Sequence, residues 1–157
     1  MTLFAAYMDN GYKVMLLFHI LAVVIAFAPA WMTPLVLRLS GSNPAGAEAL
    51  QLSILRYSLP FVAIAGIVGF GLAGMSKPEG SDEVLFKMSQ GWLVAAIILW
   101  LVQLAVLWFV ARPAFKALGE GVAEARGRVM AATGVTHVIL VVMLWLMIFK
   151  PGGPSGI

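Results

Sequence analysis

"VMLLFHILAVVIAFAPAWMTPLVL", residues 14–37, decides the fold, because it is apolar along nearly its whole length and long enough to cross a lipid bilayer. A helix of about 20 residues spans the hydrocarbon core, which is about 30 Å thick. The sequence contains further stretches of the same kind, and the predicted spans are about 14–37, 57–73, 92–111 and 129–149. A lipid-facing strand would alternate apolar and polar residues, which these stretches do not. The predicted fold class is all-α, a four-helix transmembrane bundle in one domain, 1–157.

The overall composition supports this prediction. Of the 157 residues, 62% are hydrophobic and 11% are charged, and the mean hydropathy is +0.99. These values are typical of integral membrane proteins and predict contact with a lipid bilayer. The chain has no cysteine, which excludes disulfides and thiolate metal sites. The basic residues lie between apolar stretches, a pattern of membrane topology, so we expect no nucleic-acid partner.

The loop charges predict an orientation. One side combines both chain ends with the loop between the second and third spans: Asp9, Lys13, Lys77, Glu79, Asp82, Glu83, Lys87 and Lys150. These charges balance. The other side carries Arg38, Glu48, Arg56, Arg112, Lys116, Glu120, Glu124, Arg126 and Arg128, an excess of positive charge. By the positive-inside rule, we expect both termini of this multi-pass protein to be non-cytoplasmic.

Both loops on the basic side are predicted to be partly helical. Residues 40–56, "SGSNPAGAEALQLSILR", begin as a turn and continue as a short amphipathic helix that leads into the second span. In the other loop, Lys116 and Glu120, and also Glu124 and Arg128, are four residues apart, the spacing of side-chain neighbours on a helix. We therefore expect helices that extend beyond the membrane.

Small residues concentrate in the second span. They are Ala65, Gly66, Gly69, Ala73 and Gly74. Three of them are spaced four apart, a spacing that lets helix backbones approach closely. This span is expected to be central in helix packing, either within the bundle or against another subunit. The alternative is that glycine and alanine are simply common in membrane helices.

Few polar groups lie within the predicted spans, and they include His19, Thr33, Gln103, Thr133, Thr136 and His137. All aspartates and glutamates lie outside the spans, which disfavours a proton pump or a cation pathway. The sequence has no HExxH motif, no phosphate-binding glycine loop and no catalytic serine arrangement. We predict no catalytic residues, and for Gln103 we expect an interhelical hydrogen bond.

The two histidines are candidate cofactor ligands. On the face of His19 lie mostly small residues, Ala22, Val23, Ala26, Ala30 and Thr33, so this face should be turned toward other helices or a cofactor. Neutral imidazoles commonly ligate heme iron, and His19 and His137 could hold a heme b between the first and fourth spans. No other metal is expected. The alternative is that each imidazole bonds to a carbonyl or hydroxyl of a neighbouring helix.

Two prolines interrupt the first span. Pro29 and Pro34 should kink this helix and free backbone carbonyls that neighbouring helices or water must satisfy. Lys150, followed by Pro151, should end the last helix and reach toward the membrane interface.

Several short motifs carry a resemblance. His19 is followed by "ILAVV" and, fifteen residues on, by Pro34; Gly91 and Trp92 open the third span, and the last span finishes "MIFKPG". This layout resembles an uncharacterised family of predicted bacterial integral membrane proteins with four helices. It is more distantly similar to the four-helix protoporphyrinogen oxidase family and to the copper-resistance membrane domain, which share the histidine and the terminal Lys-Pro. The oxidase resemblance implies heme binding and marks His19, Pro34, Lys150 and Pro151.

The function expected from the sequence is that of a non-catalytic accessory or structural subunit of a larger bacterial membrane complex, such as one of respiratory or photosynthetic electron transfer. The tightly packing second span and the missing catalytic motifs favour it. Its partners would be other membrane protein subunits. One alternative is a b-type heme-binding membrane oxidoreductase like the protoporphyrinogen oxidases, and another is a small permease.

Overall fold

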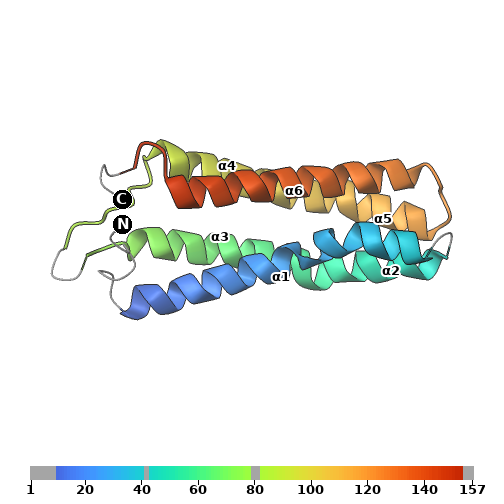
Figure 1. Ribbon diagram of the computed structural model, residues 1–157, viewed down its shortest axis with the longest axis horizontal. Helices are drawn as coiled ribbons and strands as arrows, with labels where there is room; N and C mark the ends of the chain where they lie inside the picture. Colours follow the sequence, from blue (N-terminus) through green and yellow to red (C-terminus); the bar gives the residue numbers. More distant parts are fainter. Residues whose placement is uncertain (1–9, 41–42, 79–81, 154–157) are drawn as a thin grey trace.

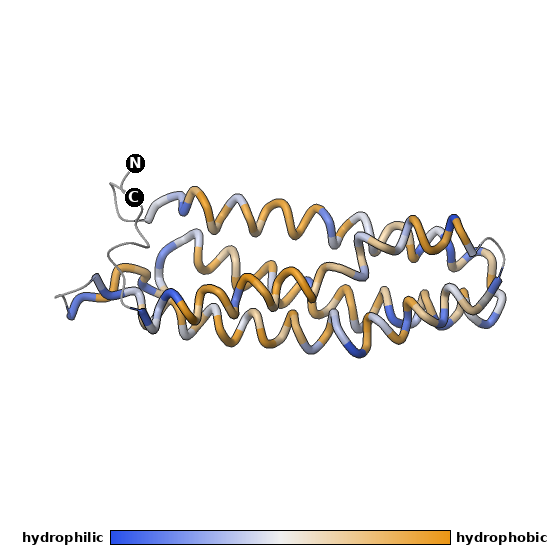
Figure 2. Tube along the Cα trace, turned by 60° about the horizontal axis from the view of Figure 1, so that its bottom comes forward, coloured by the Kyte–Doolittle hydropathy of each residue, from blue (hydrophilic) through white to orange (hydrophobic). Residues whose placement is uncertain are grey.

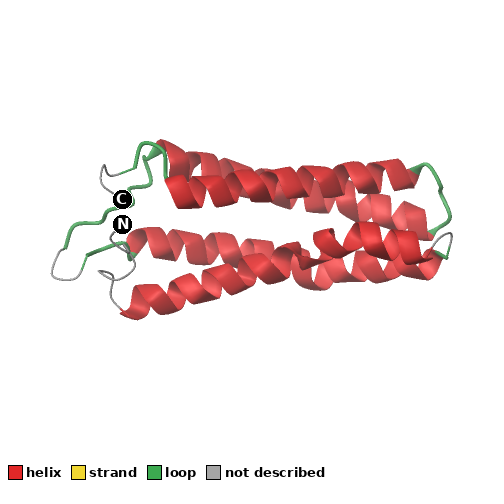
Figure 3. Cartoon of the chain, in the orientation of Figure 1, coloured by secondary structure: helices red, strands yellow, loops and turns green. Residues whose placement is uncertain are grey.

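The computed structural model describes residues 10–40, 43–78 and 82–153, and its regular elements in these ranges are helices (Figures 1 and 3). They form four long rods that run along one another. This confirms the all-α class and the prediction of four helices long and apolar enough to cross a membrane. Asp9 and Glu79, which enter the predicted charge balance, lie outside the described residues.

The first rod is α1, Asn10–Ser40, and the last is α6, Ala125–Phe149. Each middle rod consists of three helical segments in succession. Their bounds are α2 Pro44–Ser53, η2 Ile54–Ser58 and α3 Leu59–Gly74 in the second rod, and α4 Gly91–Ala105, η3 Val106–Ala111 and α5 Arg112–Gly119 in the third, where η marks a π-helix. Each predicted span lies inside one rod, and the rods exceed the spans because the helix continues through α2 and α5.

The start of α2 confirms the predicted helix ahead of the second span, while Gly41 and Ser42 of the predicted turn lie outside the described residues. The side chain of Asn43 accepts a hydrogen bond from the backbone N–H of Ala45 at 3.0 Å, and Pro44 occupies the first turn. A proline is well tolerated there, because its missing N–H would have no partner within the helix.

At the far end of the third rod, Lys116 and Glu120 form an ion pair, at 3.7 Å. Both side chains are exposed, so the pair adds little to stability. Glu124 and Arg128 form no ion pair within the described part of the chain. Glu124 instead stands directly before α6, as its N-cap residue.

Hydrophobic residues run along all four rods (Figure 2), and many of their side chains are exposed. Large and widely spaced examples are Phe18, Ile67, Phe109, Val138 and Ile148, each more than half exposed. Exposure of so much apolar surface to water would be unfavourable, whereas contact with apolar lipid tails is not. The chain is therefore a multi-pass membrane protein in contact with the bilayer.

The helix α1 packs against α3, α4 packs against α6, and α2 packs against α5, which joins the two middle rods (Figure 1). We call the end where α1 begins and α6 ends the terminal end, and the opposite end the arginine end, after Arg38, Arg112 and Arg126. Buried apolar residues form two clusters. The cluster nearer the terminal end includes Tyr12, Leu72, Phe86, Trp92 and Leu146, and the other includes Phe27, Leu50, Leu107, Phe115 and Val129.

Candidate functional site

Buried polar side chains gather at one level of the bundle, in the half nearer the arginine end. We call this level the waist and define it by Thr33 of α1, Ser58 of η2, Gln103 of α4, and Thr133 and Thr136 of α6. Each is buried, with at most 6% of its surface exposed. Burying a polar group away from water is unfavourable unless it is hydrogen-bonded. The waist is therefore the part of the membrane-spanning core with the greatest need for hydrogen-bond partners.

The regular α-helix is interrupted at the waist in both middle rods. The N–H of Leu59 donates to the carbonyl of Ile54, and that of Arg112 donates to the carbonyl of Leu107. Both bonds therefore join residues five apart, as in a π-helix. A proline follows each donor, at Pro60 and at Pro113. The proline ring would collide with the carbonyl four residues earlier, and a widened π turn is one way to avoid this contact.

A small cavity lies between these π segments and the first and last rods, α1 and α6. Its volume is about 10 Å³, which is at the lower limit for one water molecule. The wall combines residues of η2, η3 and α5 with residues of α1 and α6. Its members are Ala30, Thr33, Ile54, Ser58, Leu107, Ala111, Phe115, Ala132, Thr133 and Thr136.

Gln103 makes the interhelical hydrogen bond expected from the sequence. Its Nε2 donates to Oγ1 of Thr136, at 3.2 Å, and so joins α4 to α6. Its Oε1 is buried and has no hydrogen-bond partner within the described residues. An amide carbonyl oxygen in this position is an acceptor that lacks a donor.

The face of α1 that carries His19 is turned inward, as predicted. Ala22, Ala26 and Thr33 on this face are buried. At the proline interruption, Thr33 Oγ1 donates to the carbonyl of Pro29, at 2.8 Å. Such a bond to the preceding turn bends a helix, and α1 changes direction in this region (Figure 1).

The imidazole of His19 is held by α3, some way from the waist. One ring nitrogen, Nδ1, lies 2.9 Å from the carbonyl oxygen of Ala65. If Nδ1 carries the proton, Nε2 is left with its lone pair. The ring lies against Gly69, where an added Cβ would be 3.3 Å from Cε1 of the imidazole. A glycine at this position admits the ring to the helix backbone.

Trp100 of α4 repeats this arrangement one turn away along α3. Its Nε1 donates to the carbonyl of Val62, at 2.8 Å, and its indole lies directly on Gly66. In both cases the glycine lies one helical turn after the accepting carbonyl. Two of the small residues singled out in the sequence therefore receive rings from neighbouring helices.

The other small residues of α3 lie in different surroundings. Ala65 and Ala73 are buried. Gly74, by contrast, has nothing within 4 Å of the position that a Cβ would occupy. Of the five residues in the packing prediction, Gly66 and Gly69 thus make close contacts with rings, whereas Gly74 faces open space.

His137 is half-buried and meets α1 at Trp31, with the ring centroids 4.6 Å apart. Its Nε2 is buried without a hydrogen-bond partner in the described residues. Trp31 lies twelve residues beyond His19 on α1, which is about 18 Å of helix rise. Metal–nitrogen bonds are about 2 Å long, so this arrangement does not fit one heme iron bound by both histidines. The described residues contain no cluster of three or more metal-ligating side chains.

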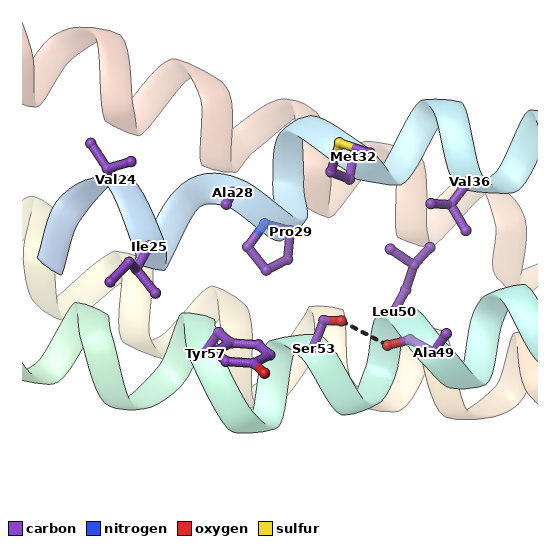
Figure 4. Close-up of a pocket in the computed structure, with 10 residues that line it drawn as sticks. All are labelled: Val24, Ile25, Ala28, Pro29, Met32, Val36, Ala49, Leu50, Ser53 and Tyr57. Atoms are coloured by element: carbon purple, nitrogen blue, oxygen red, sulfur yellow. Dashed lines mark hydrogen bonds between the residues drawn. The ribbon is translucent and has the colours of Figure 1, made fainter. Parts of the chain in front are cut away.

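An apolar groove of about 460 Å³ opens on the outside of the bundle, where α1 bends away from α2 and η2 (Figure 4). Small residues contribute to it from both rods: Ala28 and Pro29 from α1, and Ala49 and Ser53 from α2. Larger side chains complete the groove, namely Val24, Ile25, Met32, Val36, Leu50 and Tyr57. Ser53 turns its hydroxyl onto its own helix, 2.9 Å from the carbonyl of Ala49.

Sequence reasoning missed Ser58, the two π segments and the groove. Pro60 and Pro113 were available as indications of irregular helix, yet a proline near a helix start is also compatible with an unbroken one. The groove depends on how far α1 diverges from its neighbour, which no local pattern encodes.

Comparisons of the chain with protein-family models, with curated proteins and with solved structures give no significant match.

Proposed function

We propose that this protein is a non-catalytic subunit of a larger bacterial membrane complex, and that its groove receives a transmembrane helix of a partner subunit. The groove on α1 and α2 is the observation that carries the proposal. A complex of respiratory or photosynthetic electron transfer is the class expected from the sequence.

The composition of the groove suits a helix. Association of helices within lipid depends on close packing, and small residues allow the backbones to approach. Ala28, Pro29, Ala49 and Ser53 supply such residues. Met32, which also lines the groove, is flexible and adapts to a neighbouring surface. A partner helix would make fixed packing contacts in the groove. Disordered lipid tails do not keep one arrangement there.

Photo-crosslinking tests this proposal. A benzoylphenylalanine placed at Met32, in the groove, should join the protein to one specific membrane protein in native membranes. The same probe at Phe109, which is 73% exposed on another rod, should not produce that adduct. Adducts of Met32 with lipid alone, or with a second copy of this chain, would contradict the proposal.

A filled groove should release the partner. Ala28→Trp places an indole in the groove, and we expect much less partner to copurify with the tagged protein. Ala105→Trp adds the same bulk at an exposed position of α4, outside the groove, and should leave copurification unchanged. Equal losses in both variants would point to a general packing defect and argue against the groove.

The proposal includes an orientation in the bacterial inner membrane, with both termini non-cytoplasmic. The chain has no cysteine, so single cysteines can report on each end. Lys77→Cys, at the terminal end, should react with an impermeant maleimide added to spheroplasts. Lys116→Cys, at the arginine end, should react only after the membrane is opened. The reverse pattern would overturn the orientation.

A second candidate function is heme-dependent oxidoreduction, with His19 alone as a ligand. The observation that favours it is the contact between Nδ1 and the Ala65 carbonyl, because metal-ligating histidines usually donate their other ring N–H to such a group. A reduced-minus-oxidised spectrum of the purified protein should then show heme bands that His19→Ala removes. Absent bands, or bands unaffected by this substitution, would exclude the role. The permease alternative stays a prediction from the sequence.

A further inference from the structure

We propose that the waist binds one water molecule, which bridges the rods in the membrane interior. This site is separate from the groove, and it does not depend on the proposed function. It is built by Gln103 and by the hydroxyl-bearing wall of the small cavity.

The first observation is the unpartnered oxygen of Gln103. This side chain is 1% exposed, and its Oε1 has no donor within the described residues. Its Nε2 is already bonded to Thr136, which is part of the cavity wall. The amide therefore lies beside the cavity, and a donor in this neighbourhood would remove the cost of the unsatisfied acceptor.

The second observation is the cavity itself. Its volume of about 10 Å³ is at the lower limit for one water molecule, and the hydroxyl-bearing residues Thr33, Ser58, Thr133 and Thr136 belong to its wall. Buried waters typically make two to four hydrogen bonds, a number that such a wall can supply. Purely apolar cavities of this kind stay dry, and the polar wall is what distinguishes this one.

The proline at position 34 adds a further acceptor. Pro34 has no N–H to give to the carbonyl of Ala30, four residues earlier, and Ala30 belongs to the cavity wall. The wall offers neutral oxygens and no carboxylate. Water can donate to such acceptors without bringing a net charge into the bilayer, which is costly for an ion.

Double substitution tests whether the hydroxyls share a water. Thr133→Val and Ser58→Ala remove hydroxyls of different rods, between which the structure shows no hydrogen bond. Each should lower the Tm in lipid nanodiscs by about 2–4 °C, and the double variant should lose less than the sum because one water serves both. Ser53→Ala, in the groove, should combine additively with either variant. A dry cavity would instead give unchanged or raised Tm values and additive effects, which would overturn the proposal.

Nuclear magnetic resonance gives a direct readout. The side-chain amide protons of Gln103 should show a cross-relaxation peak to a long-lived water, and this peak should disappear in Thr133→Leu, which fills the cavity. Absence of the peak in the unsubstituted protein would contradict the proposal. A Tm that rises in sodium chloride relative to choline chloride, and no longer does so in Thr133→Val, would show a metal cation in place of water.

Discussion

The terminal-end half of the bundle and the waist present the same chemical group, a backbone carbonyl inside the membrane, to different donors. In the terminal-end half, ring nitrogens reach across from other helices, from Trp100 to Val62 and from His19 to Ala65. At the waist, Thr33 donates within its own helix, to Pro29.

The difference arises from glycine and proline, each of which lacks a group that other residues have. Glycine removes a Cβ, so Gly66 and Gly69 let a ring lie on the helix and touch the carbonyl one turn earlier. Proline removes an N–H, so Pro60 and Pro113 accompany widened turns beside a cavity. Glycine thus tightens the contact between rods, and proline opens space between them.

The largest expected effect comes from closing the ring contact at Gly66. In Gly66→Ala the new Cβ would overlap the indole of Trp100, which is rigid, and overpacking of this kind costs about 1–3 kcal/mol. Unfolding by sodium dodecyl sulfate in mixed micelles measures the loss.

Gly134→Ala is the matched control for Gly66→Ala. Gly134 also lies within a helix, but nothing is within 4 Å of its Cβ position. It should keep or raise stability, since alanine favours helix by about 1 kcal/mol over glycine. Equal changes in stability in the two variants would show that the packing of Trp100 does not require a glycine at position 66.

Removing the indole N–H should have the next largest effect. Trp100→Phe loses the donor to Val62, and interhelical hydrogen bonds in membranes contribute about 0.6 kcal/mol on average and up to about 1.7 kcal/mol. Thr33→Val removes a bond within one helix, so it should cost less in the same unfolding assay. A larger loss for Thr33→Val would reverse the comparison between the two regions.

Gly69→Ala should be milder than Gly66→Ala. Its Cβ would lie 3.3 Å from the imidazole of His19, which a shift of a few tenths of an ångström relieves. We expect a loss of less than about 1 kcal/mol by the same assay. A loss as large as that of Gly66→Ala would mean that the imidazole is held as tightly as the indole.

The smallest effect concerns Lys150, where α6 ends. Its backbone is left-handed, with φ 42°, and its ammonium lies 5.4 Å from the ring centre of Phe86. Burial lowers the pKa of Lys150. Between this lowered pKa and the ordinary lysine value the unfolded chain binds more protons, so the free energy of unfolding should rise with pH.

Chemical unfolding measured at a series of alkaline pH values tests this rise. Lys150→Met should flatten it, whereas Lys77→Met, at an exposed lysine of the same end, should not. An unchanged pH dependence in Lys150→Met would contradict the assignment.

The sequence predicted the spans, the helix before the second span, the inward face of His19 and the end of the last helix, because each follows from residues close together in the chain. It also indicated that Gln103 bonds between helices. It did not indicate that Ser58 would join Thr33, Thr133 and Thr136 around a cavity, because these hydroxyls belong to three different rods.

The sequence by itself determined that this chain has four helices long and apolar enough to cross a membrane, since helix length and apolar composition depend only on residues close together in the chain. Only the tertiary structure decided which rings lie on which glycines, that His19 and His137 lie far apart, and where the groove and the waist cavity form. Those features depend on the angles and depths at which rods pack, and packing is set by contacts between residues distant in sequence.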